Sequence, residues 1–267
     1  MKELLDKKVF LLDVEGVLCD NIDIQTCLPR VPEFISFLKD HDIGISIVTN
    51  ISRKPRQVVF DKLKSMGIPV LIEEIFTSGS TTAMFIKNQY PDARCFVISE
   101  WGLKKDIEDA GITISDDDVD IVAIGANRNL TFNELNHAMR LVFDGSKLIC
   151  SGTTKFFKGT FFSDTGYFLG ESSIAQAISH ATNKPVTYIG KPYPEIFQQI
   201  LSRLNISSSE AVMIGDNIQS DIRGSNLLGI DSILTTNDIQ YDYSLFSDSD
   251  KPKYVVKDIN ELCENLF

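Results

Sequence analysis

Short runs of β-branched and other apolar residues alternate with amphipathic stretches along most of this 267-residue chain. Such alternation is typical of parallel sheets, because each helix carries the chain back across the sheet before the next strand begins. The predicted strands span residues 9–14, 44–49, 94–98, 119–124, 147–150, 186–189, 211–214 and 254–256, with a further short one near residue 233. The predicted helices span residues 32–40, 55–66, 80–90, 101–110, 131–143, 170–181, 194–204, 220–228 and 258–266. The pattern therefore predicts an α/β protein with a largely parallel sheet.

Polar side chains stand at the ends of several of these strands. Asp13, Thr49 and Asp216 close the apolar runs VFLLD, ISIVT and VMIGD. Lys191 follows the strand in TYIGK, and Asp221 lies five residues after Asp216. The carboxyl ends of parallel strands meet at one edge of the sheet, and open α/β folds bind their ligands at that edge. We therefore expect these five side chains to lie close together.

Three of these side chains, Asp13, Asp216 and Asp221, are carboxylates. Mg²⁺ is a hard cation that prefers oxygen ligands and keeps part of its water shell. The three carboxylates therefore predict a Mg²⁺ site. A metal ion at this position would offset the repulsion between an anionic nucleophile and a phosphate dianion.

The remaining polar groups suit the handling of a phosphoryl group. Lys191 and the hydroxyl of Thr49 would neutralise and hold the phosphoryl oxygens, a positioning task that dominates phosphoryl transfer. Asp13 would attack phosphorus to give an aspartyl-phosphate, which water then hydrolyses. Glu15, two residues further on, is placed to protonate the leaving oxygen and later to activate that water. The predicted reaction is therefore hydrolysis of a phosphomonoester.

Composition argues against several other classes of protein. With 26 basic and 37 acidic side chains the net charge is −11, so we expect no nucleic-acid partner, which would require a basic face. No apolar run approaches a membrane span, and the N-terminal MKELLDKKVFLLD reaches an aspartate before a signal peptide's apolar region could form. The cysteines form no C-x-x-C pair, which argues against a disulfide framework or a zinc cluster; they are Cys19, Cys27, Cys95, Cys150 and Cys263. We therefore expect a soluble, cytoplasmic protein with no membrane partner.

Four segments resemble, in order, the four motifs of the haloacid dehalogenase (HAD) superfamily: DVEGVLCD, IVTN, GKPYPEIF and IGDNIQSDIRGSNLLGI. The GKP context, the spacing of GDN to the following Asp, and an insert between the second and third motifs are similar to subclass IIA. That subclass includes the NagD-like and 4-nitrophenylphosphatase-like phosphatases. The segment KPKYVVKDINEL near the C-terminus matches the closing strand and helix of the subclass, so the resemblance covers nearly the whole chain.

The resemblance implies a domain organisation. A Rossmann-like core with a parallel sheet would comprise residues 1–91 and 186–267, and an inserted α/β cap of the C2 type would comprise residues 92–185. The loop at residues 150–154 and 155–159 is the expected specificity surface. The subclass often carries an Asn-Pro-Asp-like sequence there, which this chain lacks, so its substrate cannot be carried over. A homo-oligomer formed through the cap stays open.

The resemblance also implies a role for each site residue. Asp13 would be the nucleophile and a metal ligand, and Glu15 would lend its backbone carbonyl to the metal. Asp216 and Asp221 would complete the Mg²⁺ site. The phosphate-binding residues would be Thr49, Asn50 and Lys191. The expected cofactor is Mg²⁺, and the expected substrate is a small phosphorylated metabolite.

Glu15 departs from the family pattern, because the first motif usually reads D-x-D. The extra methylene moves the carboxyl group by ~1.5 Å, and a displacement of about 1 Å can cost roughly 10²-fold in rate. We expect activity that is reduced or narrow in range. Two alternatives remain: a phosphotransferase or mutase of the same fold, and a catalytically impaired, Mg²⁺-binding regulatory protein. A nucleotide-dependent oxidoreductase is disfavoured, because no G-x-G-x-x-G follows the first strand.

Asp221 and residues 155–162 can each be interpreted as having a structural role instead of a functional one. Asp221 could be an acid at a helix start, favoured by the helix dipole rather than by a metal. The aromatic and basic segment KFFKGTFF, residues 155–162, could clamp a substrate ring or contact a nucleic acid. We expect instead a strand or hairpin that packs its phenylalanines into the second domain, since aromatic side chains suit half-buried sheets.

Overall fold

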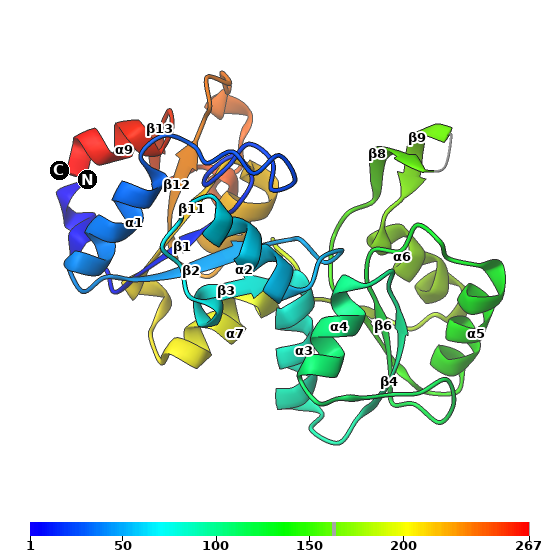
Figure 1. The fold of residues 1–267 in the computed structure, drawn as a ribbon. Coiled ribbons are helices and arrows are strands. Elements are labelled where there is room, and N and C mark those ends of the chain that lie inside the picture. Colours follow the sequence, from blue (N-terminus) through cyan, green and yellow to red (C-terminus); the bar gives the residue numbers. More distant parts are fainter. Residues whose placement is uncertain (162–163, 267) are drawn as a thin grey trace. The chain divides into compact units, whose positions relative to one another are not determined.

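The computed structural model describes residues 1–161 and 164–266 and divides into two compact units (Figure 1). Unit 1 consists of Met1–Thr49, Gln57–Phe76 and Lys191–Phe267. Unit 2 consists of Asn50–Arg56 and Thr77–Gly190. Each unit is built around a parallel sheet of its own, as the alternation of strands and helices predicts.

The sheet of unit 1 has the strand order β13-β12-β11-β1-β2-β3. Its strands are β1 (Val9–Leu12), β2 (Gly44–Thr49), β3 (Ile75–Thr77), β11 (Ala211–Gly215), β12 (Asp231–Thr235) and β13 (Tyr254–Val256). Both neighbours of β1 run parallel to it, and Leu12 stands opposite Ile47 on one side and Ile214 on the other. All residues of β1 and β11 are buried, as expected for a parallel sheet covered on both faces.

The helices of unit 1 each bury part of their surface. They are α1 (Val31–Asp40), α2 (Arg56–Ser65), α7 (Pro194–Leu204), α8 (Arg223–Asn226) and α9 (Ile259–Leu266). In α1 the buried residues Val31, Phe34, Ile35 and Leu38 recur at helical spacing. The ring of Phe34 meets that of Phe10 on β1 edge to face, with centroids 6.0 Å apart. Helix packing of this kind leaves the carboxyl edge of the sheet to the loops.

The sheet of unit 2 has the strand order β10-β7-β6-β4-β5. Its strands are β4 (Arg94–Ile98), β5 (Thr113–Ile114), β6 (Ile121–Ile124), β7 (Lys147–Cys150) and β10 (Val186–Tyr188). Its helices are α3 (Ser78–Gln89), α4 (Gly102–Asp109), α5 (Phe132–Phe143) and α6 (Glu171–Thr182). Alternate strand residues point to opposite faces. Val122 and Ile124 join a core with α5 and α6, whereas Ile121 and Ala123 join a core with α3 and α4.

The borders of the units differ from the domain borders expected from the sequence at three segments, the first of which is residues 50–56, grouped with unit 2. Residues 77–91, which contain α3, and residues 186–190, which contain β10, are grouped with unit 2 rather than with unit 1. The physical reason is that α3 shares an apolar core with α4, and β10 pairs with β7. The assignment of a core domain and a cap domain as functional parts stays a prediction.

A separate antiparallel hairpin of β8 (Phe156–Phe161) and β9 (Asp164–Leu169) belongs to unit 2 (Figure 1). The expectation that its phenylalanines pack into the domain is wrong for Phe156, which is 62% exposed. The rings pair with each other instead: Phe156 meets Tyr167, and Phe157 stacks on Phe168, both with centroids 5.6 Å apart. Phe162 lies outside the described residues.

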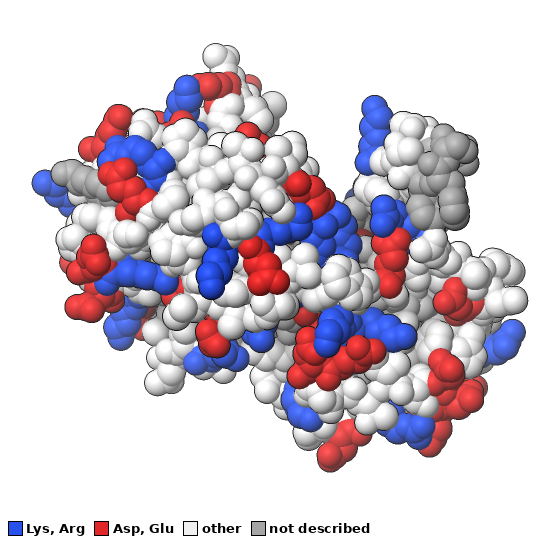
Figure 2. Space-filling model, viewed as in Figure 1, with Lys and Arg blue, Asp and Glu red and all other residues white. Residues whose placement is uncertain are grey.

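Charged side chains of both signs are interspersed over the face of the molecule shown in Figure 2. Some form ion pairs, such as Lys8 with Glu210 at 2.6 Å and Lys39 with Glu74 at 2.9 Å. Pairs of this kind near the surface add little net stability, because water and salt screen their attraction. The stability of each unit therefore rests on its apolar core rather than on its surface charges.

Asp106 is an acid buried inside unit 2, and its environment predicts a pH effect on stability. Its carboxylate accepts hydrogen bonds from the backbone N–H of Arg56 at 3.0 Å and from the hydroxyl of Thr77 at 3.4 Å. Burial nevertheless raises the pKa of Asp106 to about 6. The pKa of Asp106 is higher in the folded chain than in the unfolded chain. Its contribution to the free energy of unfolding is therefore fully present below about pH 4 and is lost as the pH rises through about 6.

We therefore expect the substitution Asp106→Asn to improve the stability of the folded chain more at high pH than at low pH. The free energy of unfolding of the variant, relative to the natural chain, should rise by about 3 kcal/mol between about pH 4 and pH 8, since one pKa unit corresponds to about 1.4 kcal/mol. Urea titrations of both proteins at the two pH values measure this. An equal difference at both pH values would contradict the raised pKa.

Candidate active site

The carboxyl ends of three neighbouring strands of unit 1 carry the residues singled out in the sequence. In the strand order β11-β1-β2, Asp216 follows β11, Asp13 follows β1, and Thr49 is the last residue of β2. The N–H of Asp13 donates to the carbonyl of Ile214 at 3.0 Å, which continues the pairing of β1 with β11 as far as Asp13. The buried, regular sheet thus fixes the backbone positions of Asp13, Thr49 and Asp216.

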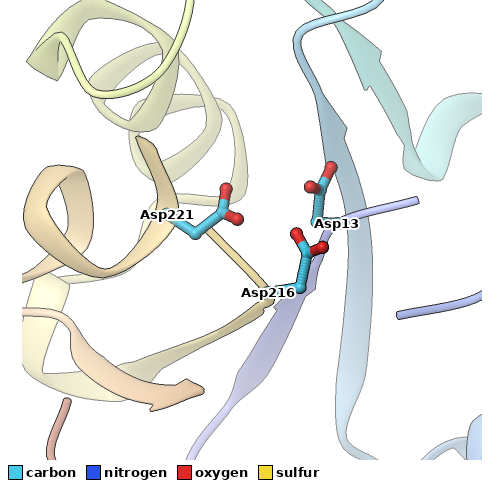
Figure 3. Close-up of side chains that lie close together, drawn as sticks. All are labelled: Asp13, Asp216 and Asp221. Atoms are coloured by element: carbon cyan, nitrogen blue, oxygen red, sulfur yellow. The ribbon is translucent and has the colours of Figure 1, made fainter. Parts of the chain in front are cut away.

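Asp13, Asp216 and Asp221 form a cluster at this edge (Figure 3). Each offers a carboxylate oxygen, and these oxygens lie within 4.8 Å of one another. Two glycines leave the space for them. A Cβ on Gly16, which has φ +77°, would lie 2.2 Å from Asp216 Oδ2, and a Cβ on Gly215 would lie 2.3 Å from the Cβ of Asp221. The close approach of the backbone therefore requires glycine at both positions.

Asp221 lies in a π-helical turn, Ile218–Ile222, that joins β11 to α8. The α-helix expected over residues 220–228 is wrong at both ends, because only Arg223–Asn226 is α-helical. The side chain of Asn217 opens the turn by accepting from the N–H groups of Gln219 and Ser220 at 2.9 and 3.0 Å. The N–H of Asn217 donates to Asp221 Oδ2 at 3.1 Å and orients that carboxylate. The turn thus aims Asp221 into the cluster.

Lys191 is the cation of the site, and its side chain is only 1% exposed. Its Nζ lies 2.8 Å from Asp13 Oδ1 and 2.6 Å from Asp221 Oδ1. It also donates to the carbonyl of Val48 at 2.8 Å. Burial lowers the pKa of Lys191, but the two carboxylates outweigh burial and raise it overall. Lys191 therefore stays protonated, and Asp221 is an ion-pair partner rather than merely an acid at a helix start.

The electrostatics of the cluster favour a further positive charge. Burial raises the pKa of Asp13 to about 7; Asp221 reinforces this shift and Lys191 opposes it. Burial also raises the pKa of Asp216 to about 6, again reinforced by Asp221. One ammonium group does not balance three carboxylates in a buried place. A set of oxygen donors with excess negative charge fits Mg²⁺.

Glu15 lies near this cluster but is not one of its three carboxylates. Its Oε1 accepts a hydrogen bond from the backbone N–H of Ile22 at 3.3 Å. Its negative charge contributes to the raised pKa of Asp216, although less than burial does. The carboxylate is thus within electrostatic range of the proposed metal ligands and is held by the segment that follows it.

The structure places the two residues of the Thr-Asn motif in different surroundings. Thr49 is 3% exposed at the end of β2. Asn50 belongs to unit 2, where its carbonyl accepts from the hydroxyl of Ser78 at 3.1 Å. Its Oδ1 lies against Gly190, since a Cβ there would be 2.9 Å away. Phosphate binding by Thr49 and Asn50 stays a prediction.

Two supporting residues at the end of β12 were missed in the sequence. The hydroxyl of Thr235 and the amide of Asn237 donate to the carbonyl of Gly16 at 3.2 and 2.9 Å. They hold the turn that follows Asp13. The segment SILTTN has the same form as the other site segments, an apolar strand followed by polar residues, so the signal was present.

Family models and single sequences of known proteins both match this chain. A family model described as haloacid dehalogenase-like hydrolase matches residues 10–113, and a HAD-hydrolase-like one matches residues 188–262. An acid sugar phosphatase of Staphylococcus haemolyticus is 31% identical over 97% of this chain and 96% of its own length. The 5'-nucleotidase YutF of Bacillus subtilis is 29% identical over 95% of this chain and 96% of its own.

Solved structures are similar over nearly the whole chain. A 4-nitrophenylphosphatase from Thermotoga maritima has a TM-score of 0.86 and 27% identity, covering 99% of both chains. A thermostable NPPase variant from Geobacillus stearothermophilus has a TM-score of 0.84 and 29% identity, covering 96% of this chain and 98% of that one. The predicted fold class, a Rossmann-like α/β core with an inserted α/β cap, is thereby confirmed. Among the described residues, no helix is both long and apolar enough to cross a bilayer.

Proposed function

The chain belongs to the haloacid dehalogenase-like hydrolases, and from this premise we propose that it is a Mg²⁺-dependent phosphatase acting through an aspartyl-phosphate on Asp13. Its phosphatase relatives identify it as a phosphoric monoester hydrolase. The single observation that carries the metal and the nucleophile is the cluster of Asp13, Asp216 and Asp221 around the buried Lys191. That arrangement joins an anionic nucleophile to cation-binding groups at the ligand-binding edge of the sheet.

Asp13, Asp216 and Asp221 would hold the Mg²⁺, together with the backbone carbonyl of Glu15 implied by the family resemblance. When bound, Mg²⁺ supplies the positive charge that lets a carboxylate approach a phosphate dianion. The raised pKa values of Asp13 and Asp216 support this assignment, because a cation would favour the ionised form of both. Asp221 would have a double task, since it also holds Lys191 at 2.6 Å.

In the first step the Asp13 carboxylate attacks phosphorus while the bond to the leaving oxygen breaks. Lys191 keeps Asp13 oriented through their contact at 2.8 Å and offers positive charge to the phosphoryl oxygens. Thr49 would donate its hydroxyl to the same oxygens. Glu15 would protonate the leaving oxygen, so that the product departs as a neutral alcohol.

In the second step water attacks the phosphorus of the aspartyl-phosphate. Glu15, now a carboxylate, would take the proton from this water, and inorganic phosphate leaves as Asp13 is regenerated. The N–H of Ile22 donates to Glu15 Oε1 at 3.3 Å and orients the side chain for this step.

The substrate class is a small phosphorylated metabolite. Relatives are named acid sugar phosphatase, 5'-nucleotidase and dihydroxyacetone phosphatase, and structural neighbours are named 4-nitrophenylphosphatases. The substrates in these names are all phosphomonoesters, and they differ in the group that leaves when the ester is cleaved. The loop at residues 150–159 of unit 2 is our proposed specificity surface, and a cytoplasmic location stays part of the same proposal.

A screen for phosphate release from small phosphomonoesters tests the function. We expect release in the presence of Mg²⁺ and a fall by about 10²-fold or more with a chelator, because a metal ion supplies several kcal/mol of charge stabilisation. Added Mg²⁺ should restore the rate. Activity undiminished by the chelator would contradict the metal requirement, and no release from any ester with Mg²⁺ would contradict the phosphatase activity itself.

A further inference from the structure

Two cysteines lie opposite each other in the segment that follows the proposed nucleophile. Cys19 and Cys27 are partners in an isolated antiparallel bridge where this segment folds back on itself. The N–H of Leu28 donates to the carbonyl of Leu18 at 2.9 Å and so flanks the bridge. This pattern makes Cys19 and Cys27 a non-hydrogen-bonded pair, the kind in which opposite Cα atoms lie about 4.5 Å apart.

The geometry of such a pair suits a disulfide. Opposite side chains of an antiparallel pair leave the same face, and a Cα separation of about 4.5 Å falls inside the range of about 4.4–6.8 Å that disulfides use. Both cysteines are free thiols. Each Sγ donates weakly to a nearby carbonyl: Cys19 to that of Val14 at 3.8 Å, and Cys27 to that of Leu28 at 3.4 Å. These weak contacts are readily given up when the side chains rotate toward each other.

We propose that Cys19 and Cys27 form a reversible disulfide with a low-molecular-weight disulfide as oxidant, and that this cross-link lowers the phosphatase activity. Cys27, which is partly exposed, attacks the oxidant; a Cys27 mixed disulfide forms and one thiol is released. The buried Cys19 then attacks Cys27 Sγ, and the second thiol leaves. Two electrons pass to the oxidant, and the two cysteine protons end on the released thiols.

Burial keeps both groups in the thiol form at neutral pH. It raises the pKa of Cys19 to about 12, with Glu15 and Cys27 adding to the shift, and it raises the pKa of Cys27. Since the thiolate is the attacking form, the exchange should need minutes to hours rather than seconds. The pair is therefore expected to remain reduced under a low oxidant concentration and to respond to sustained exposure.

The cross-link would act on the site through Glu15. The loop closed by the disulfide contains Ile22, whose N–H binds Glu15 Oε1, and the carbonyl of Cys19 accepts from the N–H of Gly16 at 2.8 Å. A closed loop would hold the Ile22 N–H on Glu15 and hinder the proton transfers proposed for that carboxylate. We expect a loss of about tenfold to 100-fold, less than the roughly 10²–10⁴-fold that a general acid–base group contributes, because the carboxylate is hindered but not removed. This part rests on the proposed function.

The test treats the whole protein with oxidised glutathione and then blocks the remaining thiols. Cleavage before aspartates separates residues 13–19 from residues 23–39, which carry one cysteine each. We expect these fragments to stay joined until a reductant is added, and the lost activity to return with the reductant. The variant Cys27→Ser should form no joined fragments and keep its activity under oxidant. The control Cys263→Ser, on α9, should behave as the natural chain does.

Each outcome bears on the proposal. Separate fragments after treatment would overturn the disulfide, and joined fragments with unchanged activity would overturn the inhibition. Equal loss of activity in Cys27→Ser would assign the loss to another group. The mapping does not depend on catalysis, so a protein that releases no phosphate even when reduced would refute the proposed function and leave the disulfide to be judged by its fragments.

Discussion

Asp13→Asn is expected to abolish phosphate release, with a fall of about 10⁴-fold or more, while the chain stays folded. The amide is nearly isosteric with the carboxylate, and its oxygen can still accept from Lys191, which lies 2.8 Å from Asp13 Oδ1. An amide does not attack phosphorus, so the aspartyl-phosphate cannot form. Phosphate release at saturating Mg²⁺ measures the loss of activity. Thermal unfolding of the variant and of the natural chain shows whether the variant is still folded.

A matched control and a trapping experiment sharpen this result. Asp20→Asn makes the same chemical change at an exposed position of the same segment and should leave the rate nearly unchanged. Beryllium fluoride, which imitates a phosphoryl group on a carboxylate, should form its adduct on Asp13 of the natural chain. An adduct on any other residue would refute the assignment of the nucleophile.

The central strands could be predicted from the sequence, and the structure gives the physical reason. The predicted bounds 44–49, 94–98 and 147–150 are those of β2, β4 and β7. Such strands lie inside parallel sheets and read as apolar runs. The short β3 and β5 were missed, because two or three residues carry no readable periodicity.

The long-range contacts of the site could not be predicted from spacing. The sequence places a polar residue at the end of each strand, but the order β11-β1-β2 decides which ends become neighbours. Lys191 meets Asp13 and Asp221 only through that order. The exposure of Phe156 was missed for a similar reason, because alternation along a strand does not say whether a layer covers either face.

The second large effect is expected at Glu15, where the chain departs from the usual pattern of its family. If its carboxyl group transfers the protons, Glu15→Gln should slow the release of phosphate from alkyl phosphates by about 10²–10⁴-fold. An aryl phosphate should lose less in the first step, because its leaving group needs no proton. Hydrolysis of the aspartyl-phosphate would still lack a base, so phosphoenzyme should accumulate and can be measured after acid quenching.

Glu15→Asp separates the position of the carboxyl group from its chemistry. The shorter acid restores the usual family geometry, but it withdraws the carboxylate by ~1.5 Å from the N–H of Ile22, which Glu15 Oε1 now reaches at 3.3 Å. Because the shorter side chain would lose this contact with the following segment, we expect the aspartate to lower kcat, though less than the glutamine does. A higher kcat for Glu15→Asp would mean that the extra methylene only misplaces the acid. Unchanged rates for both variants on every ester would remove Glu15 from proton transfer and leave that task to water or to another residue.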